Sequence, residues 1–314
     1  MSHIVVTGAR GFVGRALVRR LLADGLGGRR VAKLTLLDTT FDGLPSDDRV
    51  VQLAGSIADA ALRANAYATP VDAVFHLASV PGGAAEKNYA LGRAVNLEAT
   101  LGLLEDLRGQ PHKPRFVFAS TVAVYGERLP AVIDEHTPPA PALTYGAHKL
   151  IGETLVADAS RLGWVEGCSL RLPGIVARPG DGAGLMSAFM SQLFWKLAAG
   201  EPITVPVSET GIAWWMSVAA CVDNLLHAAT VDPERLDARR SYQMPVLRLS
   251  VGEVVAALAA RFGAERAALV TYRPDPLIER LFASYPPLLT PEAEHFGLHH
   301  DGDVDRLITR AMAA

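Results

Sequence analysis

A glycine-rich turn near the N-terminus constrains this chain more than any other feature. Residues 3–7 form a β-branched run typical of a buried strand, and the sequence Thr-Gly-Ala-Arg-Gly-Phe-Val-Gly extends from Thr7 to Gly14. Gly8 and Gly11 allow a tight turn and a close approach of the backbone to a phosphate, and Gly14 allows the following helix to pack closely on the sheet. This spacing between a strand and a helix predicts a site for the pyrophosphate of a dinucleotide.

The first half of the chain alternates short β-branched runs with longer helical patterns. Strands are expected at residues 3–7, 33–38, 50–53, 71–78, 115–120 and 165–170, and helices at 12–23, 90–107 and 145–161. Because consecutive parallel strands need helical crossovers, this alternation predicts an α/β fold with a doubly wound parallel sheet and helices on both faces.

The texture of the sequence changes after Pro173, where Gly- and Pro-rich loops and scattered short elements replace the regular alternation. One amphipathic segment, residues 217–229, has the pattern of the first domain again. We therefore expect two domains. Residues 1–172 with about 217–235 bind the dinucleotide, and about 173–216 with 236–314 form a smaller C-terminal lobe that binds the substrate.

A carboxylate ends the second predicted strand at Asp38, 24 residues after Gly14. In this position it accepts a hydrogen bond from a ribose 2′-hydroxyl and repels a 2′-phosphate, which favours NAD over NADP as the cofactor. Arg10, inside the glycine turn, argues the other way, because a guanidinium can neutralise a phosphate. Arg10 therefore leaves the choice between the two cofactors open.

The composition excludes several kinds of partner. The 314 residues include 30 Lys and Arg against 33 Asp and Glu, without a long basic run, so neither nucleic acid nor a membrane surface is an expected partner. No apolar stretch has the length of a membrane helix, and the N-terminus enters a strand directly, which predicts a cytoplasmic protein. Cys168 and Cys221 are expected as buried thiols, and His295, His299 and His300 at the surface or at a helix end, so no metal is expected.

A tyrosine and a lysine four residues apart follow the fifth predicted strand. Tyr145 and Lys149 share one face of a predicted helix, so the ammonium is expected beside the phenol, where it favours the ionised form. A free tyrosine titrates at about pH 10, and a nearby cation lowers that value toward the range of a useful base. Because Thr121 ends the strand before them, we interpret Tyr145 as a general base whose pKa Lys149 lowers.

Together these motifs resemble the short-chain dehydrogenase/reductase superfamily in its extended, epimerase-like branch. They are the glycine turn, His76-Leu77-Ala78 at the end of strand four, Asn96, Thr121, Tyr125-Gly126, the Tyr145 and Lys149 pair, and Arg171-Leu172-Pro173. The resemblance covers nearly the whole chain and implies a Rossmann domain, an NAD cofactor and a dehydrogenase that acts on a CH–OH group. It further implies that Thr121 orients the substrate hydroxyl, that Tyr145 moves its proton and that Lys149 holds the nicotinamide ribose.

The resemblance also implies a set of cofactor contacts. Besides Tyr145 and Lys149, these are Gly8, Gly11, Phe12, Val13, Gly14, Asp38, Ser56, Ile57, Leu77, Ala78, Asn96 and Pro173. One of them departs from the pattern, because Ser56 stands where many relatives carry an acid, and a hydroxyl hydrogen-bonds more weakly than a carboxylate.

The substrate is indicated by the region after strand six. Many extended-branch enzymes act on nucleotide-linked sugars and carry an Asn where this chain has Gly174, which offers only its backbone. Residues 178–191 are instead similar to the D-erythronate dehydrogenases, which oxidise a four-carbon sugar acid at C2. The resemblance therefore implies a small sugar acid as the substrate.

A small acid needs a donor for its carboxylate, and we assign that role to Arg178, with Ser187 and Thr121 as contacts to its hydroxyls. An ion pair between Arg178 and Asp181 is the competing interpretation.

Two other functions stay open at this point. A nucleotide-sugar epimerase or dehydratase would keep its NAD bound and turn over without net NADH. A non-catalytic NAD(P)-binding sensor would not need Tyr145 and Lys149, and both are present. Relatives usually form homodimers through the helices at 90–107 and 145–161, and we expect a homodimer here.

Overall fold

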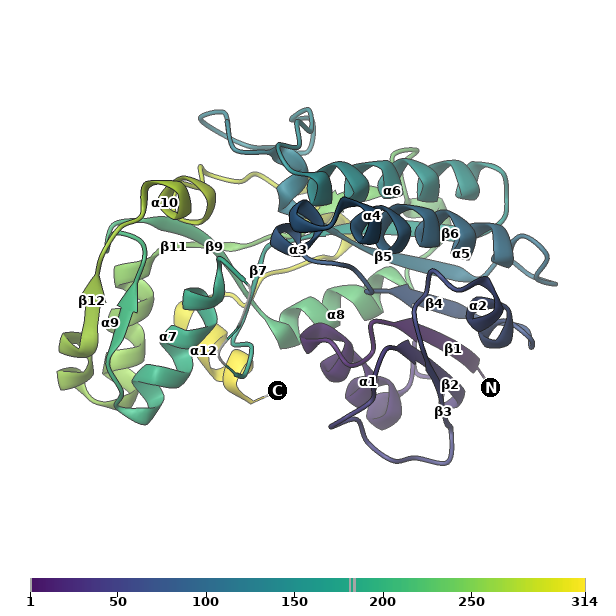
Figure 1. The fold of residues 1–314 in the computed structure, drawn as a ribbon, viewed down its shortest axis with the longest axis horizontal. Coiled ribbons are helices and arrows are strands. Elements are labelled where there is room, and N and C mark those ends of the chain that lie inside the picture. Colours follow the sequence, from purple (N-terminus) through teal and green to yellow (C-terminus); the bar gives the residue numbers. More distant parts are fainter. Residues whose placement is uncertain (1, 181, 183–184, 314) are drawn as a thin grey trace. The chain divides into compact units, whose positions relative to one another are not determined.

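The computed structural model describes residues 2–180, 182 and 185–313, and the chain divides into two compact units (Figure 1). Unit 1 comprises Met1–Gly126, Pro139–Arg171 and Val222–Gln243, and unit 2 comprises Glu127–Pro138, Leu172–Cys221 and Met244–Ala314. These bounds differ from the expected ones in three places. Residues 127–138 and Leu172 lie in unit 2, and the segment that returns to unit 1 runs over 222–243 and not over about 217–235.

A seven-stranded sheet forms the centre of unit 1. Its strands are β1 (Ser2–Thr7), β2 (Val31–Asp38), β3 (Val50–Ala54), β4 (Ala73–His76), β5 (Arg115–Thr121), β6 (Glu166–Leu172) and β10 (Ser241–Gln243), in the order β10-β6-β5-β4-β1-β2-β3. The pairs β1–β2, β1–β4, β2–β3, β4–β5 and β6–β10 are parallel. The chain winds outward from β1 to β3, returns to β4 and winds outward again, which confirms the predicted doubly wound Rossmann topology.

Helices cover both faces of this sheet (Figure 1). On one face lie α1 (Phe12–Asp24) and the part of α8 (Val218–Ala228) that belongs to unit 1, and Arg20 of α1 pairs with Asp223 of α8 at 2.9 Å. The other face carries α2 (Ala60–Ala66), α3 (Gly82–Lys87), α4 (Tyr89–Gly92), α5 (Ala99–Leu107) and α6 (Thr144–Arg161). A π-helical turn, η1 (Arg93–Glu98), joins α4 to α5, so the helix expected at 90–107 is interrupted.

The core of unit 1 explains why its strands read as continuous apolar runs. Ile4, Val5 and Val6 of β1 are all fully buried, because helices cover both faces of the sheet. Phe116 and Phe118 of β5 are buried against α5 and α6 in the same cluster. Each such side chain contributes about 1.5–3 kcal/mol through the apolar surface removed from water. The packed sheet is therefore a rigid support for the loops at its edge.

Unit 2 contains two small sheets and its own apolar core. The strands β11 (Leu247–Ser250), β9 (Ile212–Ser217) and β7 (Gly174–Val176) form one sheet in that order, and β12 (Val270–Tyr272) pairs with β8 (Ile203–Val205) in the other. Its helices are α7 (Ala188–Ala199), α9 (Val251–Phe262), α10 (Pro276–Phe282), α11 (Pro291–Phe296) and α12 (Val304–Met312). Trp215 and Phe194 are fully buried in the core between these elements.

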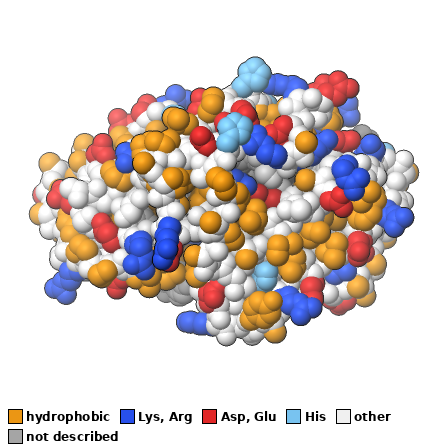
Figure 2. Space-filling view, turned by 90° about the horizontal axis from the view of Figure 1, so that it is seen from above, with side chains coloured by type: hydrophobic (Ala, Val, Ile, Leu, Met, Phe, Trp, Pro, Cys, Tyr) orange, Lys and Arg blue, Asp and Glu red, His pale blue; other side chains and the backbone are white. Residues whose placement is uncertain are grey.

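The surface carries charges of both signs. Figure 2 shows Lys and Arg side chains interspersed with Asp and Glu over the face in view. The face in view therefore has no broad positive area of the kind that binds a phosphate backbone.

Among the residues that the structure describes, no helix is long and apolar enough to span a bilayer.

Candidate active site

The glycine turn lies at the point where the winding of the sheet reverses, between the ends of β1 and β4. Gly8 adopts a left-handed conformation with φ of 71°, and a Cβ there would lie 2.7 Å from the backbone nitrogen of Ala78. A Cβ on Gly14 would lie 2.2 Å from the carbonyl oxygen of Gly8. Gly14 was expected to let the helix pack closely on the sheet, and it also leaves space for the backbone of the glycine turn at Gly8. No residue other than glycine fits at either position without moving the backbone.

This turn fits the phosphates of a dinucleotide. Gly11 precedes α1, where within the described chain no side chain caps the helix and no acid occupies its first turn. A helix start that carries no acid suits an anion, because the helix dipole favours negative charge there. Phe12 and Val13, in that first turn, are both half-buried.

Asp38 stands at the end of β2 beside the same turn. One carboxylate oxygen accepts the backbone N–H of Arg10 at 2.8 Å, and the other accepts the N–H of Thr39 at 2.7 Å. The first oxygen keeps a second lone pair that can accept a ribose hydroxyl, whereas the second also accepts the Thr39 hydroxyl at 3.4 Å. The Arg10 guanidinium lies 3.7 Å from the carboxylate of Asp42, so its charge has an acidic neighbour. This arrangement fits NAD better than NADP, because negative charge gathers where a 2′-phosphate would lie.

A chain of hydrogen bonds fixes the loop that follows β4. The ring of His76 bonds to Thr7 through Nδ1 at 2.7 Å and to Thr100 through Nε2 at 2.9 Å. The Thr100 hydroxyl donates to the carbonyl of Asn96, so it accepts from His76, and Nε2 carries the proton. Burial lowers the pKa of His76 well below its ordinary value, aided by the nearby Lys149, which keeps the ring neutral. The ends of β1 and β4 are thereby locked together.

Asn96 acts on the same loop. Its side-chain oxygen accepts the N–H of Val80 at 2.7 Å, and its amide nitrogen donates to the carbonyl of Val80 at 2.9 Å. The residue is 1% exposed. Asn96 therefore positions the segment from Leu77 to Val80, and its amide is already occupied by this backbone.

Tyr145 and Thr121, which the sequence placed in one site, do lie together. The side chains of Thr121 and Ser79 are within hydrogen-bonding reach of the Tyr145 phenol. The Thr121 oxygen accepts the N–H of Ala123 at 3.2 Å, which leaves its hydroxyl proton free to be donated to a neighbouring oxygen. Ser79 was not predicted. Its signal in the sequence was its place directly after the strand expected at 71–78, because parallel strands end at one edge of the sheet.

The pKa of Tyr145 does not move in the expected direction. Burial raises the pKa of Tyr145, and the bonds to Ser79 and Thr121 only partly oppose that effect. The Lys149 ammonium lies 5.8 Å from the centre of the tyrosine ring and donates to the carbonyl of Ala119 at 2.7 Å. Lys149 is itself 2% exposed, and burial lowers its pKa to about 7, against the field of Glu153. The net direction is therefore opposite to the expected lowering, because desolvation by burial is the largest effect on Tyr145 in this structure.

Two glycines allow α6 to bring these residues to the strand ends. A Cβ on Gly146 would lie 2.5 Å from the carbonyl oxygen of Ala123, in the turn that follows β5. A Cβ on Gly152 would lie 2.7 Å from the ring of Phe118 on β5. The carboxylate of Glu86 accepts the first N–H of α6, at Thr144. Helix α6 thus packs directly on β5, which the pattern of helix and strand alone did not predict.

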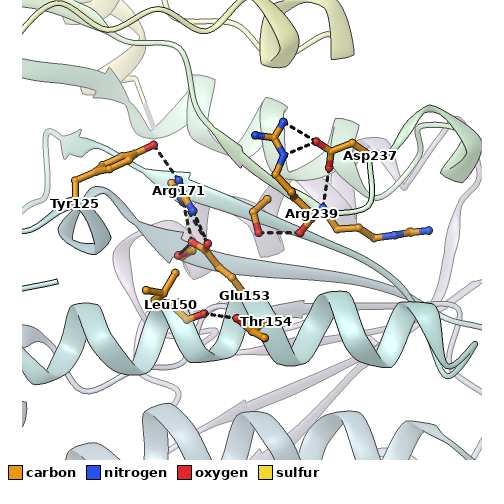
Figure 3. Close-up of polar contacts among 10 residues, drawn as sticks. Tyr125, Leu150, Glu153, Thr154, Arg171, Asp237 and Arg239 are labelled. Atoms are coloured by element: carbon orange, nitrogen blue, oxygen red, sulfur yellow. Dashed lines mark hydrogen bonds and ion pairs between the residues drawn. The ribbon is translucent and has the colours of Figure 1, made fainter. Parts of the chain in front are cut away.

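A buried ion pair crosses from α6 to β6 (Figure 3). Glu153 and Arg171 share two short contacts, Nε to Oε1 at 2.9 Å and Nη2 to Oε2 at 2.7 Å. Ser120 donates to the same carboxylate, and Arg171 also donates to the Tyr125 hydroxyl at 2.9 Å. Arg171 and Tyr125 were predicted as parts of motifs, whereas Glu153, which completes this network, was not predicted.

The other expected contacts lie in both units. Ser56 is exposed after β3, whereas the side chain of Ile57 is 4% exposed and belongs to the core of unit 1. In unit 2, Pro173 is buried and Ser187 is half-buried directly before α7. Burial lowers the pKa of Arg178, whose carbonyl accepts the indole N–H of Trp195 at 3.0 Å. Asp181, the competing partner for Arg178, lies outside the described residues.

Metal ligands and reactive thiols are not evident in the part of the chain that the structure describes. No cluster of three or more His, Cys, Asp or Glu side chains occurs there. Cys168 and Cys221 are both buried, and burial raises the pKa of the Cys168 thiol to about 12. A thiol in such surroundings stays protonated and unreactive.

Comparison with known proteins gives consistent matches. Residues 4–242 match the NAD dependent epimerase/dehydratase family. A D-erythronate dehydrogenase from Cupriavidus necator is 37% identical over 99% of this chain and 98% of its own length. A D-erythronate dehydrogenase from Haemophilus influenzae is 31% identical over 90% of each chain.

One solved structure is also close. The crystal structure of a nucleoside-diphosphate-sugar epimerase from Agrobacterium tumefaciens is 33% identical, with a TM-score of 0.91 over 98% of this chain and 92% of that one.

Proposed function

Because the chain belongs to the NAD dependent epimerase/dehydratase family, we propose that it is a dehydrogenase that oxidises D-erythronate at C2. The reaction is D-erythronate and NAD⁺ to 2-oxo-D-erythronate, NADH and a proton. The observation that carries this proposal is the 37% identity to a D-erythronate dehydrogenase over 99% of the chain. The family match ends at residue 242, whereas this identity extends through the rest of unit 2, the part expected to bind the substrate.

The residues at the sheet edge have the chemistry that the cofactor requires. We propose that Gly8, Gly11 and the start of α1 hold the pyrophosphate, and that Asp38 accepts the adenosine ribose. We assign the nicotinamide ribose to Lys149, whose ammonium lies beside Tyr145. When bound, the oxidised nicotinamide adds a positive ring to the site and accepts a hydride from C2.

Tyr145 is the proposed general base. Its phenolate accepts the proton of the C2 hydroxyl and becomes the phenol, and Thr121 donates a hydrogen bond that orients the same substrate oxygen. Burial raises the pKa of Tyr145 in the protein alone, so the ionised form needs further stabilisation when the site is filled. A hydrogen bond from Ser79 to the phenolate supplies part of it, while the single hydroxyl proton of Thr121 is donated to the substrate oxygen.

We propose that the substrate carboxylate is bound from unit 2 by Arg178, with Ser187 as a contact to a hydroxyl. A desolvated guanidinium binds a carboxylate strongly, because charge-assisted hydrogen bonds gain strength away from water. Ser187 precedes α7, and within the described chain its side chain makes no capping bond, so its hydroxyl can serve a ligand.

A second candidate activity comes from the solved epimerase. That protein is named a nucleoside-diphosphate-sugar epimerase and is 33% identical to this chain. Such an enzyme would regenerate its NAD in each turnover, whereas a dehydrogenase releases NADH. Net formation of NADH therefore separates the two candidates.

We further propose that the protein is a cytoplasmic homodimer. Leu101 on α5 and Ile151 on α6 are 39% and 43% exposed, and two copies of these helices could bury them in a four-helix contact. Size-exclusion chromatography with light scattering measures the mass in solution, and a monomer would contradict this arrangement.

The test is the appearance of NADH from NAD⁺ with a panel of D-erythronate, D-threonate and L-threonate. Turnover of D-erythronate that is lost in Tyr145→Phe supports the proposal. Absence of NADH across the panel, together with conversion of UDP- or GDP-linked sugars without added NAD⁺, would establish the epimerase instead. The variant keeps the ring and removes only the hydroxyl, so the fold is expected to persist.

A further inference from the structure

Glu153 is the third member of a stripe along α6 that begins with the two proposed catalytic residues. Tyr145, Lys149 and Glu153 are spaced four apart, which places them on one helix face. Glu153 is 4% exposed, and a buried carboxylate is costly unless charged or polar partners surround it. Its partners therefore indicate what it does.

Those partners come from two different strands. Arg171, near the end of β6, holds the carboxylate through both oxygens at 2.9 and 2.7 Å. Ser120, near the end of β5, donates to one of the same oxygens. Figure 3 shows Arg171 pointing from β6 to Glu153 on α6 and, on its other side, to Tyr125. A bidentate pair of this kind fixes direction as well as distance.

Ser120 and Tyr125, which belong to the hydrogen-bond network of Glu153, are close in sequence to the proposed catalytic residue Thr121. Ser120 precedes Thr121, and Tyr125 lies in the turn η2 (Val122–Tyr125) that Thr121 caps. A shift of Glu153 would therefore move Thr121 relative to the helix that carries Tyr145. Because small displacements of reacting groups cost large factors in rate, this contact controls the site geometry.

The pair also acts on Lys149 through charge. The groups that face the ammonium are Tyr145 and Glu153 on α6, the neutral His76 on β4, and, on β5, the carbonyl of Ala119 and the ring of Phe118, whose centre lies 4.6 Å from the nitrogen. Burial lowers the pKa of Lys149, and Glu153 raises it. Burial also disfavours the charge on Arg171 of β6, but the bonds to Glu153 outweigh it and raise the pKa of Arg171, so the guanidinium stays charged.

We propose that Glu153 is a positioning residue of the active site: it holds α6 against the ends of β5 and β6, and its carboxylate favours the charged form of Lys149, which lies one turn before it on the same helix face. Arg171 and Ser120 fix the carboxylate, and Glu153 is the member of the Glu153–Arg171 pair that faces Lys149. The catalytic part of this role rests on the proposed function, whereas the effect on Lys149 does not.

The charge effect is tested by NMR titration of the protein with ¹³C-labelled lysine side chains. The sequence has five lysines, and Lys149→Met identifies the signal of Lys149. The wild-type signal should titrate at about pH 7. In Glu153→Gln/Arg171→Gln, which removes both charges and leaves no unpaired ion, the midpoint should fall by about one pH unit or more. The variant Asp47→Asn/Arg49→Gln, which removes another bidentate pair, is the matched control and should leave it unchanged.

The positioning effect is tested with Ser120→Ala. This variant removes one anchor of Glu153 but keeps the carboxylate, so the Lys149 midpoint should stay near the wild-type value. The kcat should fall about fivefold to tenfold without a change in KM for NAD. An unchanged Lys149 midpoint in the double variant would overturn the charge role, and an unchanged kcat in Ser120→Ala would overturn the positioning role. If the double variant does not fold, Glu153→Asp replaces it. Aspartate keeps the negative charge, so the titration midpoint of Lys149 should stay near the wild-type value. A midpoint that falls by about one pH unit or more in Glu153→Asp would contradict the proposal.

Discussion

Gly146 is predicted to support catalysis because a side chain at this position would collide with the turn that follows Thr121. It follows Tyr145 directly on α6, and an added Cβ would lie 2.5 Å from the carbonyl oxygen of Ala123. Relief of that contact needs a movement of at least about half an ångström, since Cβ atoms do not approach other atoms closer than 3.0 Å. The moving parts are the helix that carries Tyr145 and the turn that follows Thr121.

Two opposing effects decide the outcome for Gly146→Ala. Alanine favours a helix over glycine by about 1 kcal/mol, whereas overpacking costs about 1–3 kcal/mol. We expect a net loss of stability of about 1 kcal/mol and, because a misplacement of 1 Å can cost about a hundredfold in rate, a fall in kcat of about tenfold.

Steady-state kinetics and urea unfolding of Gly146→Ala measure these two quantities. Gly109→Ala is the matched control, because a Cβ at Gly109 would meet no atom within 4 Å. A Gly146→Ala protein that is more stable than the wild type and equally active would refute the reasoning from this contact.

Three further predictions follow from the charges. Asp38→Ala should raise the KM for NAD about tenfold or more and reduce the preference over NADP, whereas Asp42→Ala, at the exposed partner of Arg10, should change little in the same kinetics. Arg178→Ala should raise the KM for the sugar acid by at least about tenfold at constant KM for NAD, and an unchanged KM for the acid would exclude a carboxylate contact. Because the folded state lowers the pKa of Lys149 from 10.5 to about 7, the unfolded chain binds its proton more strongly, and wild-type stability should rise from pH 7 to about 10. Denaturation at several pH values should show a weaker rise in Lys149→Met, and equal slopes would contradict the lowered pKa of Lys149.

Much of the fold could be predicted because it depends on local pattern. The alternation of strands and helices gave the doubly wound sheet, and the glycine turn gave the position where the winding reverses. The placement of Tyr145 near Thr121 could also be predicted. Thr121 ends β5, and Tyr145 lies at the start of α6, which begins at the same edge of the sheet. These features can be predicted from residues that are close in sequence, together with the fact that the strands are parallel.

The remaining features depend on burial and on contacts between distant segments. The direction of the pKa shift of Tyr145 is set by desolvation, which no spacing of residues reveals. Glu153 and Arg171 are 18 residues apart, and their pairing requires the actual packing of α6 on β6. The three-residue strand β10 is too short to give a pattern, so the extent of the segment that returns to unit 1 was underestimated.

The central claim is that hydride leaves C2 of a four-carbon sugar acid. The most direct measurement uses D-erythronate with deuterium at C2, NAD⁺ and the purified enzyme, followed by mass spectrometry of the reduced cofactor. The proposed reaction predicts that each NADH carries the deuterium and that 2-oxo-D-erythronate accumulates in equal amount. Reduced cofactor without deuterium would place the oxidation at another carbon, and no reduced cofactor at all would contradict the dehydrogenase.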